Sequence, residues 1–406
     1  MSATATPTRH RAGLEGPVGS AQVRRSNERR TKPWLSRQSF VNELELLPFD
    51  RWQQLADSAT ETEVARALAT KRPGPAQVAA LVSKTASTRL DELTERAQRL
   101  TRQRFGNTVQ LFAPLYLSNE CVSTCLYCGF AMKNRTPRKT LTMAELETEL
   151  ETLANRRFRH QLLVSGEHPK AVSVAYLVDA VCTAKRWAPF VQLEVQAQDQ
   201  TTYELLRPAG LDGVVIYQET YDRKAYERLH PYGVKKSIEY RLDAPDRIGR
   251  ARIKRVGLGV LLGLTERWRT DVVALAAHAQ YMQRQYWRTQ VTVALPRLKP
   301  AVGGFEGPTV VGNRDFLQAI CALRLALPEA GIVLSTREPQ ELRDALIGVG
   351  VTQMSAGSST APGGYEHPGE AEAQFAIDDE RSATEVAAAI AAHGYEPVWK
   401  DWERGI

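Results

Sequence analysis

The sequence predicts an α/β protein with a (βα)8 barrel at its core. From Val109 onward, short apolar runs alternate with longer amphipathic runs, a pattern typical of parallel strands joined by helical crossovers. Eight such strand–helix units close naturally into a barrel, and an open doubly wound sheet is the alternative. The expected strands cover residues 109–117, 161–164, 191–195, 213–217, 256–262, 290–295, 331–334 and 351–354.

Two further segments flank the predicted barrel, which we place at residues 105–380. Residues 39–104 are expected to form an N-terminal helical extension, because apolar residues recur there at helical spacing and Pro73-Gly74-Pro75 marks a break. Residues 381–406 are expected to form a C-terminal helix and tail that close the barrel.

The basic charge of the chain is concentrated at its N-terminus. Residues 1–38 hold eight Lys or Arg and two Glu, so they carry +6 of the total formal charge of +7. This segment is rich in small and polar residues, and we expect a disordered basic tail there, with an organellar transit peptide as the alternative. A basic tail is a much weaker sign of nucleic-acid binding than a basic folded face. No apolar run approaches the roughly 20 residues that cross a bilayer. We therefore expect a cytoplasmic protein that binds neither nucleic acid nor membrane.

Polar residues, many of them types used in catalysis, directly follow nearly every expected strand. In a (βα)8 barrel these positions meet at the C-terminal mouth, where such enzymes place their chemistry. The positions concerned are 118–119, 165–168, 218–220, 296–297, 335–338 and 355–359. The pattern therefore predicts an active site at the mouth of the barrel.

Three of the five cysteines, Cys121, Cys125 and Cys128, lie within eight residues directly after the first expected strand. This clustering and the odd total do not suggest a disulfide framework. A structural zinc site and most electron-transfer clusters use four protein ligands, and no fourth ligand lies nearby in the sequence. Three thiolates at C-x3-C-x2-C instead fit a [4Fe–4S] cluster whose fourth iron stays open to bind another molecule.

This cysteine spacing, placed after the first strand of a barrel, resembles that of the radical S-adenosylmethionine (SAM) enzymes. The resemblance implies that SAM binds the open iron and is cleaved to release a 5′-deoxyadenosyl radical. It also implies that Phe130 lies beside the adenine. Ser165-Gly166-Glu167 then stands where these enzymes have Gly-Gly-Glu, whose polar groups receive the SAM ammonium group, with Ser165 replacing the first Gly.

Longer stretches resemble one family of these enzymes, the 2-iminoacetate synthases, from about residue 35 to the C-terminus. The matching segments are 115–121, 134–141, 217–221, 230–231, 257–264, 354–359 and 397–402. The implied reaction cleaves the Cα–Cβ bond of L-tyrosine to 2-iminoacetate and p-cresol, and SAM yields 5′-deoxyadenosine and methionine. The imine would supply the thiazole of thiamine, so thiazole synthase is an expected partner and a flavodoxin or ferredoxin the expected electron donor.

Related families remain as alternatives. The tyrosine-cleaving maturase of [FeFe]-hydrogenase carries a second cluster on C-terminal cysteines, and no cysteine follows Cys321 here. Tryptophan lyases and deazaflavin-forming synthases are further relatives. Outside enzymes, the alternative is an interaction protein that carries a metal cluster.

Further residues are candidates for binding SAM and tyrosine. Glu194 and Gln196 are two apart, so we expect them on one face of the third strand, where a carboxylate could hold the SAM ribose. Arg337 is the expected partner of the tyrosine carboxylate, because a guanidinium binds a carboxylate with two hydrogen bonds, and Arg297 competes for this role. The remaining candidates for the substrate site are Tyr116, Ser355 and Ser358.

Overall fold

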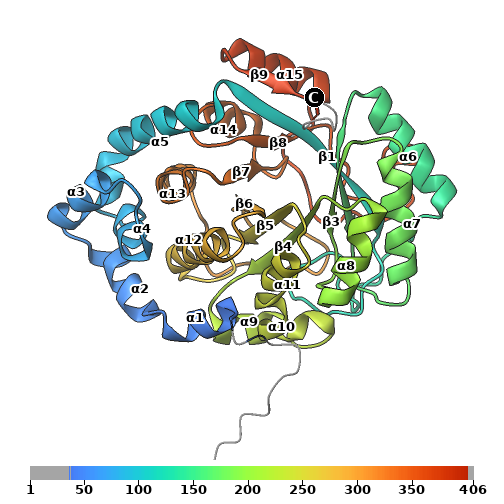
Figure 1. Cartoon of the computed structure of the whole chain (residues 1–406), viewed down its shortest axis with the longest axis horizontal. Coiled ribbons are helices and arrows are strands. Elements are labelled where there is room, and N and C mark those ends of the chain that lie inside the picture. The colour runs from blue at the N-terminus through green and yellow to red at the C-terminus, as the bar shows by residue number, and fades with distance from the viewer. Residues whose placement is uncertain (1–35, 37, 401–406) are drawn as a thin grey trace, which may run out of the picture. The chain divides into compact units, whose positions relative to one another are not determined.

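The computed structural model describes residue 36 and residues 38–400, and these contain a closed barrel of parallel strands surrounded by helices (Figure 1). Strands β1 to β8 pair in sequence order, and β1 pairs with both β2 and β8. The sheet therefore has no free edge within the barrel. The prediction of a (βα)8 barrel is confirmed, and the open-sheet alternative is excluded.

Each expected strand overlaps an observed one, with ends shifted by a few residues. The strands are β1 (Thr108–Ser118), β2 (His160–Ser165), β3 (Phe190–Glu194), β4 (Gly213–Glu219), β5 (Arg255–Val260), β6 (Gln290–Ala294), β7 (Gly331–Leu334), β8 (Gln353–Ser355) and β9 (Glu396–Val398). Strand β9 was not expected, because three residues are too few for an alternating pattern. It pairs with the start of β1, at Thr108 and Gln110.

Five α-helices precede the barrel. Helices α2 and α4 pack against α12 (Trp268–Gln285), and α4 and α5 pack against α13 (Asn313–Ala326). The five helices are α1 (Phe40–Leu46), α2 (Phe49–Ser58), α3 (Glu61–Ala69), α4 (Pro75–Leu81) and α5 (Leu90–Phe105), with the short 3-10 helix η1 (Ala86–Arg89) between the last two. Ser39 caps α1, and the backbone N–H of Phe40 donates to the Asp246 carboxylate at 3.1 Å.

The remaining helices connect or follow the barrel strands. They are α6 (Met143–Asn155), α7 (Val174–Lys185), α8 (Gln200–Ala209), α9 (Arg223–Leu229), η2 (Val234–Lys236), α10 (Ile238–Leu242), α11 (Ala244–Arg250), α12 (Trp268–Gln285), α13 (Asn313–Ala326), α14 (Gln340–Ala345) and α15 (Ala383–Ala392). No helix in the described part of the chain has the length and apolar character needed to span a membrane.

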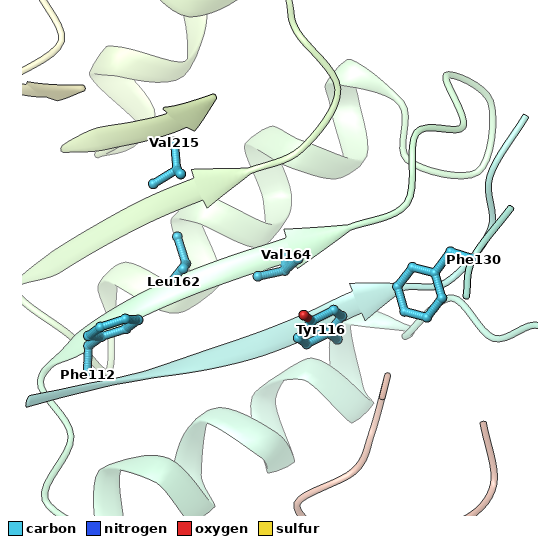
Figure 2. Packing of buried hydrophobic residues seen from close by; sticks show 6 residues of the cluster. All are labelled: Phe112, Tyr116, Phe130, Leu162, Val164 and Val215. Carbon is cyan, nitrogen blue, oxygen red and sulfur yellow. The ribbon is translucent and has the colours of Figure 1, made fainter. Parts of the chain in front are cut away.

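Alternate residues of the strands fill the barrel interior. Figure 2 shows Phe112 and Tyr116 on one face of β1, with Leu162 and Val164 on β2 and Val215 on β4 pointing toward them. The spacing of two or four residues within each strand follows from the pleat, which sends successive side chains to opposite faces. The same register pairs Tyr116 with Val164, and Val164 with Glu194, so these three residues form one layer across adjacent strands.

The predicted basic tail lies almost wholly outside the described residues, of which only Ser36 and Gln38 belong to it. Residues 401–406, at the end of the predicted C-terminal segment, also lie outside them. Between these limits the last elements of the chain are α15 and β9.

Candidate active site

The loop with the three cysteines leaves the C-terminal end of β1 and is held in place by Arg138. The Arg138 guanidinium donates four hydrogen bonds of 2.6–3.0 Å to backbone carbonyls of this loop, those of Asn119, Phe130, Ala131 and Asn134. The Asn119 side chain adds a bond from its amide to the Pro137 carbonyl at 2.8 Å. Because the loop has no regular secondary structure, these bonds satisfy carbonyls that would otherwise lack partners.

Two glycines allow neighbouring segments to lie directly against the cysteine loop. The N–H of Gly166 donates to the Ser118 carbonyl at 2.9 Å, and a Cβ at Gly166 would lie 2.3 Å from the Glu120 carbonyl oxygen. Gly233 has a φ of +100°, and a Cβ there would lie 2.4 Å from the Ser123 Cα. Only glycine fits either approach without displacement of the backbone.

The three thiols lie in a protected environment with hydrogen-bond donors near the sulfur atoms. Cys125 is buried, and Cys121 and Cys128 are half-buried. The Ser123 N–H donates to Cys121 Sγ at 3.4 Å, and Gln374 Nε2 lies 3.8 Å from Cys128 Sγ. Burial raises the pKa of Cys121 to about 11 and also raises the pKa of Cys125 and Cys128. The thiols are therefore neutral at pH 7 unless a bound metal displaces their protons.

Two buried ion pairs lie next to the cysteine loop. Lys235 Nζ is 2.6 Å from a Glu219 oxygen, and Arg241 is 2.9 Å from a Glu167 oxygen. Burial alone would raise the pKa of Glu219, but the cations of Lys235 and Arg241 hold it below its usual value. Glu219 also has a φ of +69°, a backbone conformation that costs energy for any residue with a Cβ and is common at functional sites.

The neutral side chain of His230 contacts Tyr127 of the cysteine loop and lies near Lys235 of the first ion pair. His230 Nδ1 lies 2.8 Å from the Tyr226 carbonyl, which can only accept, so Nδ1 carries the proton. The Tyr127 hydroxyl, 2.8 Å from Nε2, therefore donates to this nitrogen. Burial, with the nearby charge of Lys235, lowers the pKa of His230 to about 3, so it stays neutral at physiological pH.

A pocket opens at the mouth of the barrel, and the space between its lining atoms, open solvent included, is about 710 Å³. Phe112, Leu162, Val164, Leu295, Phe316, Val333 and Phe375 give it apolar walls, and its polar lining includes Tyr116, Glu194, Thr336, Arg337, Ser355 and Gln374. The Tyr116 hydroxyl donates to Gln374 Oε1 at 2.8 Å. Burial, with the negative charge of Glu219, raises the pKa of Glu194 to about 7. The mixture of apolar and polar lining residues suits a small amphipathic molecule.

Arg337 is the cation of this cavity. Its guanidinium lies over the Phe375 ring, and within the described residues it forms no ion pair. Arg297 lies differently: its Nε is 2.7 Å from the Glu338 carboxylate, and its Nη1 donates to Val311 and Asn313 at 3.0 and 2.9 Å. Of the two expected carboxylate binders, the structure therefore leaves Arg337 available and engages Arg297.

Of the other predicted site residues, Ser355 lines the cavity, whereas Gln196 and Ser358 do not. Gln196 donates to the Val172 carbonyl at 3.5 Å and does not line the cavity, because β3 ends at Glu194 and the alternation of faces ends with it. Ser358 does not line the cavity either. Ser355 lines it, although its hydroxyl accepts the Thr336 N–H at 3.0 Å. Ser165 donates to the Gly166 carbonyl at 2.9 Å.

Phe130 is buried and packs edge-on against Tyr116, with ring centroids 5.9 Å apart (Figure 2). It therefore connects the end of the cysteine loop to the cavity wall. Figure 2 shows its ring beyond the end of β1, on the side of Tyr116 away from Phe112. This places the loop and the cavity side by side.

Comparison with known proteins agrees with this geometry. Residues 115–276 match the model of the radical SAM superfamily, and residues 294–396 match the Biotin and Thiamin Synthesis associated domain. The chain is 44% identical to the 2-iminoacetate synthase of Escherichia coli K12, over 87% of this chain and 96% of that protein. The enzyme of the same name from Salmonella typhimurium LT2 is 43% identical over the same shares.

The chain belongs to the 2-iminoacetate synthase family. Among solved structures, HydG, a maturase of the [FeFe]-hydrogenase, is 32% identical with a TM-score of 0.78, over 88% of this chain and 78% of that chain. HydG from Carboxydothermus hydrogenoformans is 29% identical with a TM-score of 0.77, over 88% and 81%. The recognition from sequence is therefore confirmed at the level of the family.

Radical SAM enzymes such as the 2-iminoacetate synthases use a [4Fe–4S] cluster and SAM, and the residues present fit both. Cys121, Cys125 and Cys128 would hold three irons. In the described part of the chain no three Cys, His, Asp or Glu are placed to hold one metal ion. A [4Fe–4S] cluster does not need three ligands on one metal ion, because each of its irons binds a single thiolate. The N–H donors near two of the sulfurs would stabilise the negative charge of a bound cluster.

Several residues of this 2-iminoacetate synthase site were not among the predicted site residues. Gln374 contacts both Tyr116 and Cys128 but belongs to an irregular segment with no periodicity. Lys235 and Arg241 lie in short helical turns after β4 and form ion pairs that no spacing rule predicts. Arg138 lies inside a segment that resembles the family, which is the one available sign of its importance.

Proposed function

We propose that this chain is a radical SAM lyase that cleaves the Cα–Cβ bond of L-tyrosine to 2-iminoacetate and p-cresol. The observation that carries the proposal is Arg337, a guanidinium without an ion pair in the described structure, in an aromatic-lined cavity beside the three-cysteine loop. An amino acid with a large aromatic side chain matches a cavity that offers one cation and otherwise mostly apolar walls.

Within this proposal, Arg337 binds the tyrosine carboxylate with two hydrogen bonds. The Phe375 ring under the guanidinium limits its rotation, and both residues line the cavity. The ring of the substrate packs against the apolar wall that Phe112, Leu162 and Val333 contribute. Tyr116 and Ser355 line the same cavity and provide hydroxyl groups for the polar end of the substrate.

In this proposal Cys121, Cys125 and Cys128 would hold the cluster, and Glu167 and Glu194 would contact SAM. When bound, the cluster and SAM supply a 5′-deoxyadenosyl radical, which leaves as 5′-deoxyadenosine, with methionine as the second product. The Glu167 carboxylate lies 2.9 Å from Arg241, and its remaining lone pairs can accept hydrogen bonds from the SAM ammonium group. Glu194 faces the cavity and can accept hydrogen bonds from ribose hydroxyls when ionised.

The products and the electron requirement indicate the partners. 2-Iminoacetate hydrolyses readily in water, so an enzyme that consumes it at once is the expected recipient, and thiazole synthase of thiamine biosynthesis is our proposal. The cluster needs one electron for each SAM that is cleaved. A flavodoxin or ferredoxin of a cytoplasmic, reducing compartment is the proposed source.

The test is a product analysis of anaerobically reconstituted protein with SAM, dithionite and L-tyrosine, with L-tryptophan in parallel. The proposal predicts p-cresol and glyoxylate, the hydrolysis product of the imine, with tyrosine alone. The variant Arg337→Gln should lose these products at low tyrosine concentration. Formation of 5′-deoxyadenosine without p-cresol would retain the radical SAM chemistry and reject tyrosine as the substrate.

A further inference from the structure

Apolar side chains are exposed to solvent around the cysteine loop. Four of the eight exposed large apolar side chains in the described part of the chain are Met132, Tyr232, Val234 and Val302, with exposed fractions of 49, 61, 42 and 42%. Tyr232 and Val234 follow α9, Met132 belongs to the cysteine loop, and Val302 lies between β6 and α13. Residues from three distant parts of the sequence thus bring exposed apolar groups to one place.

Hydrogen bonds tie these three segments to the loop. Ser123 is the centre: its carbonyl accepts the Met132 N–H at 2.9 Å, and its hydroxyl accepts the Lys235 N–H at 3.3 Å. The Thr124 N–H donates to the Tyr232 carbonyl at 3.1 Å.

The third segment is joined through one side chain. Asn134 Nδ2 donates to the carbonyls of Val302 and Gly129 at 2.9 Å each, and to that of Cys128 at 3.2 Å. Residues 131–136, 231–237 and 301–305 therefore form one surface directly outside the cysteines, which we call the rim surface.

The rim surface is positively charged. Its three segments contain four Lys or Arg and no Asp or Glu. Lys235 is largely buried in its ion pair with Glu219, whereas Lys133, Arg135 and Lys236 are exposed and form no ion pair within the described residues. An apolar patch that is surrounded by unpaired cations attracts a partner that carries negative charge and some apolar surface.

We propose that the rim surface is the docking site for a small acidic electron-carrier protein. The inference rests on the proposed function, which requires one electron per cleaved SAM. The carrier loses one electron and the cluster gains it, so the carrier is the reductant and no other co-reactant takes part. Docking on the rim surface would bring the carrier's redox group next to Cys125 and Cys128 without opening the barrel. A modest interface with apolar and charged contacts is typical of transient electron-transfer complexes.

The test compares two ways of reducing the same enzyme. The steady-state rate of 5′-deoxyadenosine formation is measured with dithionite, and then with increasing concentrations of a photoreduced flavodoxin and a photoreduced ferredoxin. The carrier that gives the higher kcat/KM with the wild-type enzyme is used for the variants. The double variant Lys133→Glu/Lys236→Glu reverses the charge of the rim surface, and Lys133→Gln/Lys236→Gln removes it.

A matched control changes the net charge equally at another place. Lys71→Glu/Lys84→Glu alters two exposed lysines of the N-terminal helical region. We expect the charge reversal on the rim surface to raise the KM for the carrier roughly tenfold or more, the Gln pair to raise it less, and the control to leave it nearly unchanged. The rate with dithionite and the iron content should stay the same in all variants. Added salt should raise the wild-type KM and affect the reversed variant much less.

Three results would overturn the docking proposal. The first is a KM for the carrier that does not change in the charge-reversed variant, and the second is an equal increase of this KM in the control variant. The third is a loss of rate with dithionite as large as the loss with the carrier, which would place the effect in the active site. A wild-type enzyme that forms no 5′-deoxyadenosine with dithionite would contradict the proposed function itself. The two failures are therefore distinguishable.

Discussion

The guanidinium carbon of Arg337 lies 3.3 Å from the centroid of the Phe375 ring. The two residues belong to different parts of the barrel mouth, Arg337 after β7 and Phe375 in the irregular segment between β8 and α15. Stacking on an aromatic ring orients a planar cation without using its N–H donors. The donors of Arg337 thus remain free for a carboxylate in the cavity.

The first prediction concerns this arginine. Arg337→Lys keeps the charge but loses the bidentate geometry and the stacking, so kcat/KM for tyrosine should fall about 100-fold, or roughly 2.7 kcal/mol. The effect should appear mainly as an increased KM. Arg297→Lys is the matched control: it weakens the bond to Glu338 and should lower the melting temperature while the KM for tyrosine changes by less than about threefold. The reverse pattern would assign the carboxylate to Arg297.

A second prediction concerns the pH dependence of SAM binding. The pKa of Glu194 is raised to about 7, so this carboxyl is mostly protonated at pH 6 and mostly ionised at pH 8. Only the ionised form accepts hydrogen bonds from two ribose hydroxyls with both oxygens. The affinity for SAM, measured by anaerobic equilibrium dialysis, should therefore increase as the pH rises from 6 to 8. Glu194→Gln should bind SAM more weakly and without this increase; an equal pH dependence in the variant would remove Glu194 from the SAM site.

Arg138 should be essential for retention of the cluster. Replacement by Lys cannot satisfy four carbonyls with one ammonium group, and we expect a loss of about 2 kcal/mol in the stability of the loop. Cluster loss on addition of a chelator, followed by visible absorbance, should be several times faster than in the wild type. Arg135→Lys provides the comparison, since Arg135 is exposed and should show the wild-type rate. Equal rates in both variants would refute this role of Arg138.

Gly166 should be intolerant of any side chain. A Cβ there would meet the Glu120 carbonyl at 2.3 Å, so Gly166→Ala must displace the cysteine loop and should reduce the iron content after reconstitution. Gly312→Ala is the matched substitution, because a Cβ at Gly312 meets nothing within 4 Å and should cost less than about 1 kcal/mol. Full cluster content in Gly166→Ala would show that the loop can move aside.

The sequence predicted those features that follow from local rules. The alternation of strands and helices predicts the barrel, and the residues at the end of each strand are expected at its mouth. Local sequence patterns were therefore enough to assign Glu194, Arg337 and Ser355 to the region of the cavity. The strand pattern similarly predicted that the three cysteines lie on the loop after β1.

Other features depend on contacts between distant residues and had no local signal. Arg297 and Arg337 both follow a strand, and only the position of Glu338 beside Arg297 separates their roles. Gln196 was expected on the face of Glu194, but β3 ends before the alternation reaches it. Gln374 reaches Cys128 across 246 residues of sequence, which no periodicity can reveal.

The most direct test of the tyrosine lyase assignment is the ratio of p-cresol to 5′-deoxyadenosine formed by the reconstituted enzyme with SAM, dithionite and L-tyrosine. Each deoxyadenosyl radical that reacts with bound tyrosine should release one p-cresol, so the account predicts a ratio near one at saturating tyrosine. The ratio should fall in Arg337→Gln, because SAM cleavage would continue without positioned substrate. A ratio near zero in the wild-type enzyme would contradict the assignment.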